Sequence, residues 1–396
     1  MNDATTSTTR GESAEILIER ARSLVPALRQ RSKQANADGR LPRETIDDFQ
    51  RLGLTRCLQP KMFGGFGSDY RVFSKMIRAL AQGCGSSAWV CAVHTEHSWV
   101  VGQFSESAQH AVWDDDPLAV ASASFMVGST ADVVAGGHRL SGRWGYVSGC
   151  DYAQWVLLHA MVKGDGAPEA RLFLVPIGEV EIIDDWDVLG LRGTGSKSVT
   201  VKNLLVPADR SVSIHELKTG TAPGTAVHAD NPLYRTPRNM LALFSLSTVN
   251  VGLAERAVTE FVEFTRARQS RGVRVAGLEA MQLMVAEASA QAETAALIGE
   301  HTIDRATQMV ESRQAITADD VAWSRRNASY STQLAQSAVR LIFEAAGGTA
   351  LYASNPLQEI FRDVMAASAH LSLTWHRAAP PYGQLRLGLP VDFDSL

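Results

Sequence analysis

The stretch SGRWGYVSGCD, residues 141–151, combines three glycines, two aromatic residues and two serines in one short segment. Glycine allows the backbone to bend and to approach a ligand closely. Trp144 and Tyr146 offer broad flat faces, and the hydroxyl of Ser148 can donate or accept a hydrogen bond. The pattern fits the wall of a site for a flat, polar-edged ligand. It equally fits a glycine-interrupted β-strand with aromatic core residues.

The composition is that of a globular chain with more than one domain. The 396 residues exceed what one ordinary core holds, and 45% of them are hydrophobic against 20% charged. A net charge of −4 does not indicate a nucleic-acid or anionic-membrane partner. The polar N-terminal stretch and the lack of about 18 consecutive apolar residues predict neither a signal peptide nor a membrane span, so we expect a cytoplasmic protein. The four cysteines form no CxxC pair, which favours free thiols in a reducing compartment.

The order of hydrophobic periods predicts an α+β fold with segregated layers. Helical spacing dominates residues 1–117, strand-like runs separated by turns dominate 118–212, and long helical patterns return in 213–396. We interpret these ranges as an N-terminal helical domain, a central β domain and a C-terminal helical bundle. Residues 219–232, rich in Gly, Ala, Thr and Pro, predict a long loop, and the last long helix is expected over 357–378.

A buried helix is expected over residues 83–104, and it carries two histidines. His94 and His97 are three residues apart and share one helix face, with Glu96 nearby. The pattern raises the question of a metal site, but no third ligand follows at local spacing, so we predict no metal. Two interpretations remain open: core histidines held by hydrogen bonds, or a substrate pocket to which one of them contributes.

Four strings carry a resemblance to a known family: PKMFGGFG (60–67), WGYVSG (144–149), LGLRGTGSKSVTVKNLLVP (189–207) and AAGGTALYASNPLQEIFRD (345–363). They are similar to segments of the acyl-CoA dehydrogenase superfamily, and the similarity extends over nearly the whole chain. The resemblance implies an N-terminal helical domain, a central β-barrel or sandwich and a C-terminal four-helix bundle. It also implies a homotetramer and a flavin, whose isoalloxazine ring would lie against the run at 141–151.

The chain departs from the dehydrogenases of that superfamily at the catalytic base. Those enzymes need a carboxylate that removes a carbon-bound proton. The segment 371–388 contains no Asp or Glu, and the segment 241–254 contains none either. With Arg362-Asp363 followed by His370, the chain resembles instead the oxygenase components of two-component monooxygenases. Those enzymes hydroxylate phenols such as hydroxyphenylacetate or the phenolic ring of degraded steroids.

The resemblance implies a mechanism in which a separate reductase delivers reduced FMN or FAD. Oxygen would form a flavin C4a-hydroperoxide, which hydroxylates an aromatic, phenolic substrate. Ser148 would hold the flavin N5–H in a dry pocket. His370 would take the phenol proton or steady the hydroperoxide, and His97 would orient the substrate hydroxyl. Glu344 stands where the family has an adenine-side glutamine, which leaves FMN and FAD both open.

The same resemblance assigns binding roles to a wider set of residues. The candidate substrate-binding residues are Ser122, Ser124, His94 and Trp144. The candidate flavin-binding residues are Trp144, Tyr146, Ser148, Arg192, Arg271, Arg274, Gly347 and Gly348. The arginines would bind phosphate, across a subunit boundary for Arg271 and Arg274, or would only complement a helix dipole and solvate the surface.

Other functions remain open at this point: an acyl-CoA dehydrogenase-like desaturase with an unrecognised base, an oxygenase acting on nitrogen or sulfur of a non-phenolic substrate, and a flavin-free scaffold. No nicotinamide site is expected, because Gly193-Thr194-Gly195 leads into a strand and not into a helix. The expected partners are a flavin reductase, O₂ and a small aromatic substrate, with neither nucleic acid nor membrane.

Overall fold

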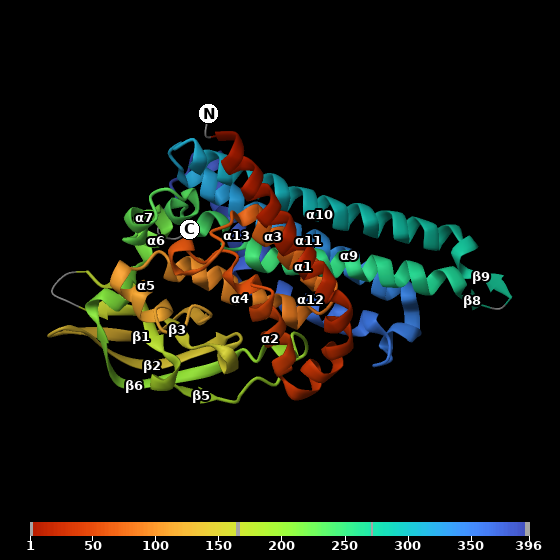
Figure 1. Ribbon diagram of the computed structural model, residues 1–396. Helices are drawn as coiled ribbons and strands as arrows, with labels where there is room; N and C mark the ends of the chain where they lie inside the picture. The colour runs from red at the N-terminus through yellow and green to blue at the C-terminus, as the bar shows by residue number, and fades with distance from the viewer. Residues whose placement is uncertain (1–2, 164–166, 271, 393–396) are drawn as a thin grey trace.

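The large sheet lies at one end of the molecule with helices along one of its faces, and a long helical bundle extends away from it (Figure 1). The computed structural model describes residues 3–163, 167–270 and 272–392. The N-terminal helices are α1 (Asp3–Asp38), α2 (Arg43–Arg51), α3 (Tyr70–Ala81), α4 (Gly85–Val101) and α5 (Glu106–Trp113). Asp69 caps α3 by accepting the backbone N–H groups of Arg71 and Val72, and Ser105 caps α5 in the same way. Every residue of α4 is buried, so this helix is enclosed on all sides and can present polar side chains only to internal partners.

The central strands form one seven-stranded sheet with the order β5-β6-β2-β1-β3-β4-β7. Strands β1 and β2 form a hairpin, whereas β1 and β3 run parallel. One apolar cluster packs the sheet against α4 and α5, and a second cluster is enclosed by β1, β2, β3, β4 and β6 themselves. The strands are β1 (Ala121–Val134), β2 (Gly137–Val147), β3 (Trp155–Lys163), β4 (Glu169–Pro176), β5 (Glu181–Ile183), β6 (Lys197–Pro207) and β7 (Ser211–Ser213).

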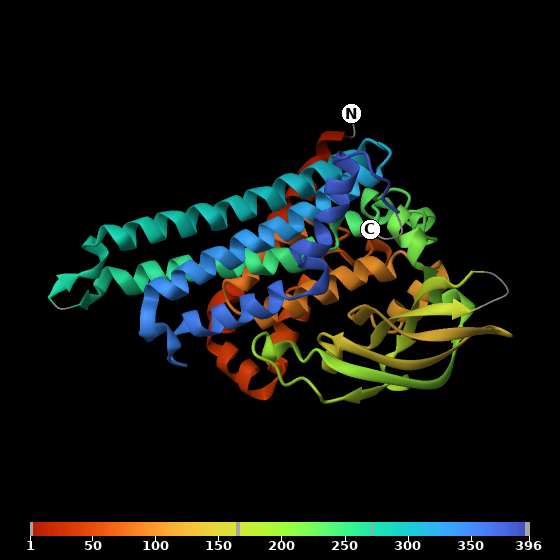
Figure 2. The ribbon, with the colours of Figure 1, turned by 180° about the vertical axis from the view of Figure 1, so that it is seen from behind.

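Four long helices build the C-terminal bundle: α9 (Phe244–Ala267), α10 (Glu279–Glu311), α11 (Ala318–Ala346) and α12 (Pro356–Ser368). A small hairpin of β8 (Gln269–Ser270) and β9 (Val273–Arg274) joins α9 to α10 at the bundle end far from the large sheet (Figure 2). The shorter helices are α6 (Ile214–Thr219), α7 (Gly224–Val227), α8 (Arg238–Leu241), α13 (Trp375–Ala378) and α14 (Pro380–Arg386).

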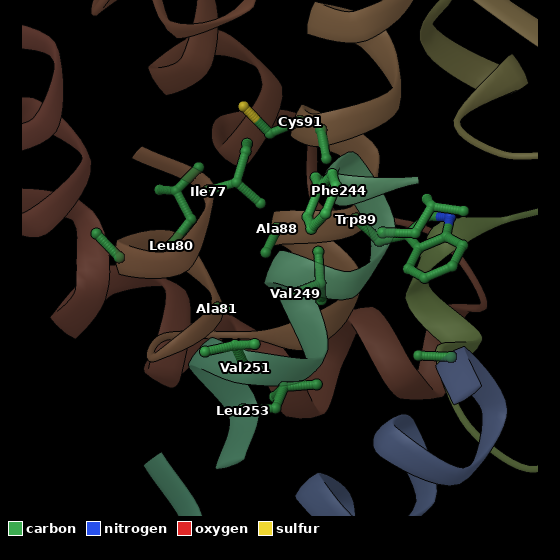
Figure 3. Close-up of a cluster of buried hydrophobic side chains, with 14 of the residues drawn as sticks. Ile77, Leu80, Ala81, Ala88, Trp89, Cys91, Phe244, Val249, Val251 and Leu253 are labelled. Atoms are coloured by element: carbon green, nitrogen blue, oxygen red, sulfur yellow. The ribbon is translucent and has the colours of Figure 1, made fainter. Parts of the chain in front are cut away.

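Helix α9 runs through the hydrophobic core of the molecule. The span Arg238–Ala267 is apolar and long enough to cross a membrane, but 83% of its most apolar window is buried inside the protein, as expected of a core helix. Phe244, Val249 and Leu253 of α9 pack against α3 and α4 (Figure 3). In the same view the indole of Trp89 on α4 points away from these side chains.

Two predicted elements differ from the structure. The expected loop at 219–232 contains the short helix α7, with α6 directly before it. The last long helix ends at Ser368 and not at 378, and the chain then turns through the short 3₁₀ helix Leu371–Leu373. His370 therefore lies beyond the helix, where it caps that 3₁₀ turn.

Candidate functional site

Three distant segments meet around Ser148. Trp89 on α4 donates its indole N–H to Ser148 Oγ at 3.2 Å. The rings of Trp89 and His370 lie 6.1 Å apart between centroids. Helix α4, the end of β2 and the turn after α12 therefore bring one hydroxyl, one indole and one imidazole together, although 222 residues separate Ser148 from His370.

Ser148 also begins a chain of hydroxyl groups. Its Oγ lies 2.7 Å from Ser196 Oγ, which lies 2.7 Å from Thr194 Oγ1. Thr194 Oγ1 donates to the backbone carbonyl of Leu191 at 2.8 Å. The three hydroxyl-bearing residues are between 2% and 8% exposed. Buried hydroxyl groups need partners inside the protein, and this chain supplies them in series.

The serines of β1 attach this strand to β2. Ser122 donates to the carbonyl of Ser148 at 2.8 Å, and Ser124 donates to the carbonyl of Gly145 at 2.9 Å. His94 Nε2 lies 3.3 Å from both Ser122 Oγ and the Gly149 carbonyl. Because the carbonyl only accepts and Ser122 has already given its hydrogen away, Nε2 must carry the proton. Burial lowers the pKa of His94 to about 3, so the ring is neutral.

His97 has the opposite tautomer from His94. Its Nδ1 donates to the carbonyl of Ala121 at 2.8 Å, which leaves the lone pair on Nε2. That nitrogen lies 3.5 Å from Glu96 Oε2. Burial, with the positive charge of Arg238 in the same direction, lowers the pKa of His97 to about 3. A neutral imidazole with a lone pair on Nε2 can accept a hydrogen bond from a neighbouring hydroxyl.

Glu96 is buried and is held by Arg238. Arg238 Nη2 lies 2.9 Å from Glu96 Oε1, and the guanidinium stacks 3.6 Å above the centre of the Phe125 ring. Phe125 also faces His97 at 5.9 Å. Burial raises the pKa of Glu96, and the nearby Arg238 charge opposes that rise. The ion pair of Glu96 and Arg238 adds no net charge to the surroundings of His97.

His370 follows helix α12 and keeps part of its side chain exposed. Desolvation of the imidazole by the surrounding protein lowers its pKa to about 4, and the charge of Arg238 contributes in the same direction. Its Nδ1 accepts the backbone N–H of Ser372 at 3.4 Å. The neutral ring therefore carries its hydrogen on Nε2 and acts there as a donor.

Trp144 and Tyr146 point in different directions. Trp144 is 1% exposed, lies in the core enclosed by the strands and donates to the carbonyl of His159 at 2.8 Å. Its ring has no exposed face, so this position does not support the interpretation of Trp144 as a substrate- or flavin-contacting residue. Tyr146 is 64% exposed, has a backbone φ of 60° and meets Trp186 edge to face at 6.0 Å.

The predicted phosphate ligands are spread over the molecule. Arg192 binds the carbonyls of Asn36 and Val188 and the carboxylate of Asp187, so it attaches α1 to the segment before β6. Arg274 is exposed on β9, and Arg271 lies outside the described residues.

Gly347 and Gly348 lie beyond α11 and have open space where a Cβ would stand. The link between Arg268 and the Ala346 carbonyl places these glycines beside the end of α9, which leads into the β8-β9 hairpin. Helix α12, 13 residues and about 20 Å long, separates this end of the bundle from His370.

Sequence reasoning missed several residues of the site. Trp89 precedes His97 by two helical turns and so lies on the same side of α4, a spacing that could have identified it. Thr194 and Ser196 lie inside a quoted family string but had been assigned no role. Arg238 carried no local signal, because its partner Glu96 is 142 residues away.

Comparison with known proteins identifies relatives along nearly the whole chain. Residues 12–114 match the family model for the acyl-CoA dehydrogenase N-terminal domain, and residues 244–375 match a model for the acyl-CoA dehydrogenase C-terminal domain. The FADH(2)-dependent resorcinol hydroxylase, oxygenase component, of Rhizobium sp. (strain MTP-10005) is 31% identical over 385 residues, 94% of each chain. The flavin-dependent monooxygenase oxygenase subunit HsaA of Rhodococcus jostii is 33% identical over 383 residues, 94% of this chain and 99% of its own.

A solved structure agrees with these relatives. The crystal structure of 3-HSA hydroxylase from Rhodococcus sp. RHA1 superimposes with a TM-score of 0.92 at 31% identity, covering 96% of this chain and 99% of its own. The predicted fold class and the predicted resemblance to oxygenase components are thereby confirmed.

Proposed function

The chain belongs to the oxygenase components of flavin-dependent monooxygenases, which have the acyl-CoA dehydrogenase fold, and on this premise we propose that it hydroxylates a phenolic substrate. The relatives act on aromatic compounds with reduced flavin, so a flavin reductase is the expected partner. The observation that carries the phenolic assignment is the lone pair of His97 Nε2, which can accept the hydrogen bond of a substrate hydroxyl because Nδ1 donates to the Ala121 carbonyl.

The residues present fit a reduced flavin. Ser148 is a buried hydroxyl at the meeting point of α4, β2 and the turn of His370, and its bonds leave room for one more hydrogen-bond partner. When bound there, reduced flavin supplies the electrons that activate O₂. Ser148 would hold the N5 edge of the ring, and Tyr146, exposed two residues before it, would cover part of the ring.

His97 would position and deprotonate the substrate. Its Nε2 accepts the hydrogen bond of the phenol hydroxyl, which increases the electron density of the aromatic ring. As the ring is attacked, the proton moves to Nε2, and the carboxylate of Glu96 at 3.5 Å stabilises the resulting imidazolium. General base assistance of this kind accelerates reactions by about 10²–10⁴.

His370 would act as a donor and not as a base. Its Nδ1 is engaged with the Ser372 N–H, so its Nε2–H is available to the oxygen that is being delivered. Trp89, in contact with both His370 and Ser148, would keep the imidazole and the flavin edge in register. The serines Ser122 and Ser124 would shape the site indirectly, since each gives its hydrogen to the backbone of β2 or the residue that follows it.

A desaturase would need a carboxylate free to remove a carbon-bound proton. Among the described residues, two buried carboxylates lie near these segments, and both have structural partners. Glu96 is paired with Arg238, and Asp363 accepts the backbone N–H of Leu191 at 2.7 Å. These contacts favour oxygenation.

The end of the bundle far from the large sheet would bind part of the flavin of a second copy of the chain. Gly347 and Gly348 lie about one length of α12, roughly 20 Å, from His370, and Arg274 lies on the hairpin at that same end. Together with Arg271 they would hold the phosphate of a flavin whose ring sits in a neighbouring subunit, within a homotetramer. FMN and FAD both carry a phosphate that these residues could bind.

The test is a product analysis. The protein is incubated with an independent flavin reductase, NADH, FMN or FAD, and a panel of phenols, indoles, aryl sulfides and aryl amines. Formation of catechols or hydroquinones from phenols supports the proposal. Products oxidised only at nitrogen or sulfur would contradict the phenolic substrate and indicate N- or S-oxygenation. Formation of unsaturated thioesters from a parallel acyl-CoA panel would contradict oxygenation and indicate a desaturase.

A further inference from the structure

The direction of every hydrogen bond in the hydroxyl chain of Ser148, Ser196 and Thr194 follows from counting hydrogens. Each hydroxyl has one hydrogen to donate. The Leu191 carbonyl can only accept, so the hydrogen of Thr194 points to it. In the bond between Thr194 and Ser196, the donor must then be Ser196. Ser196 has no hydrogen left for Ser148, so Ser148 donates to Ser196.

The carbonyl at the end of this chain is firmly fixed as an acceptor. Leu191 O also accepts from the indole N–H of Trp186 at 3.3 Å and from the backbone N–H of Thr194 at 3.1 Å. The N–H of Leu191 in turn is held by Asp363. Thr194 is 2% exposed and Ser196 is 5% exposed. Bulk water therefore has little access to these hydroxyl groups and cannot readily reverse the direction of their hydrogen bonds.

Ser148 is consequently an acceptor toward any further partner. Its only hydrogen goes to Ser196, and one of its two lone pairs receives the Trp89 indole N–H. One lone pair remains. A group placed against it must bring a hydrogen, because two facing acceptors in a buried site lose a hydrogen bond and repel each other.

We propose that Ser196 and Thr194 are positioning residues that select the redox state of the flavin by fixing Ser148 as an acceptor toward flavin N5. This inference rests on the proposed function, because it requires the N5 edge at Ser148. Reduced flavin has a hydrogen on N5 and satisfies the remaining lone pair. Oxidised flavin presents only a lone pair there and does not.

This selection would suit an oxygenase that receives flavin from a separate reductase. The protein retains the form that reacts with O₂ and releases the oxidised form for the next reduction. The preference for reduced flavin would come from Thr194 and Ser196, which need not touch the flavin. It would exist before any substrate is bound.

The test measures the dissociation constants of oxidised and of reduced FMN and FAD, the latter without oxygen, for the full-length protein and its variants. Wild type is expected to bind the reduced form roughly tenfold tighter or more, from the cost of a mismatched buried acceptor. Ser196→Ala frees the Ser148 hydrogen to turn toward N5, so the preference for reduced flavin should fall by about tenfold. Thr194→Val should act in the same direction, and Thr194→Ser, which keeps the hydroxyl, should restore the preference.

Ser198→Ala is the matched control. Ser198 is a buried hydroxyl at the start of β6, two residues after Ser196, but it donates to Asp185 and takes no part in the hydroxyl chain. A preference that stays unchanged in Ser196→Ala and Thr194→Val, or that changes equally in Ser198→Ala, overturns the inference and leaves the proposed function standing. A wild-type protein that binds neither redox state of either flavin overturns both.

Discussion

The indole N–H of Trp89 donates to the hydroxyl oxygen of Ser148 across 3.2 Å, and this bond joins the most buried N-terminal helix to the end of β2. The same indole faces His370 at 6.1 Å. One side chain thus couples the residue assigned to the flavin edge with the residue assigned to oxygen delivery. The functional groups of the site are held by the packing of α4, which is buried along its whole length.

Trp89→Phe should uncouple the enzyme. The ring would still pack against His370, but Ser148 would lose a donor, at a cost of about 1 kcal/mol in the free energy of unfolding. The product formed per NADH should fall, and released hydrogen peroxide should rise by the same amount. Trp99→Phe is the control, since Trp99 on the same helix donates to the distant Leu233 carbonyl. It should lose similar stability and keep its coupling, and uncoupling in both variants would argue against a specific role for Trp89.

His97→Gln should slow hydroxylation by about 10²–10³ in single-turnover experiments, because it removes the base. The loss should be largest for weakly acidic phenols and smallest for phenols that are already ionised at the assay pH. Binding of reduced flavin should be unchanged. An equal loss across phenols of all acidities would mean that His97 only shapes the pocket.

Breaking the Glu96–Arg238 pair should give asymmetric losses of stability. Arg238→Gln leaves a carboxylate that is 3% exposed without its cation, and we expect a cost of about 3–5 kcal/mol. Glu96→Gln leaves an arginine that is 21% exposed and can reach water, so its cost should be smaller. A double-mutant cycle in chemical denaturation measures the coupling. Equal costs for the two single variants would contradict this description.

Asp363→Asn should change how stability depends on pH. Burial raises the pKa of Asp363 to about 7, from an ordinary value of 3.8. Between these values the folded protein binds a proton that the unfolded chain has released, so wild-type stability falls as pH rises, by up to about 1.4 kcal/mol per pH unit. The variant cannot ionise there, so its stability relative to wild type should increase from about pH 4 to pH 7. The buried histidines, whose pKa values are lowered, have the opposite slope but cancel in this difference. A stability difference between variant and wild type that does not change with pH would contradict the raised pKa of Asp363.

The sequence was sufficient for the order of helices and strands, but it did not reveal that Trp144 lies in the core enclosed by the strands. Trp144 and Ser148 are four residues apart, so regular alternation would place them on the same face of the strand. The pairing of β2 with β6 shifts register between Trp144 and Val147, and Tyr146 has a positive φ. This irregularity turns Trp144 into the strand-enclosed core and leaves Ser148 facing α4.

The remaining site residues depend on contacts between distant segments. Glu96 and Arg238, or Ser148 and His370, are brought together only when α4 is enclosed by the sheet and the bundle. His370 was expected inside a helix, but α12 ends two residues earlier, and the ring gains its orientation from capping the turn that follows. Local periodicity contains no information about either arrangement.

The most direct measurement of the central claim is a single turnover with isotopically labelled O₂. The protein is mixed under anaerobic conditions with chemically reduced FMN or FAD and a phenol that it binds, and labelled O₂ is then added without any reductase. We predict a hydroxylated product that contains one labelled oxygen atom, in wild type and to a much smaller extent in His97→Gln. Reoxidation of the flavin with full release of hydrogen peroxide and no labelled product, across the phenol panel, would contradict the account.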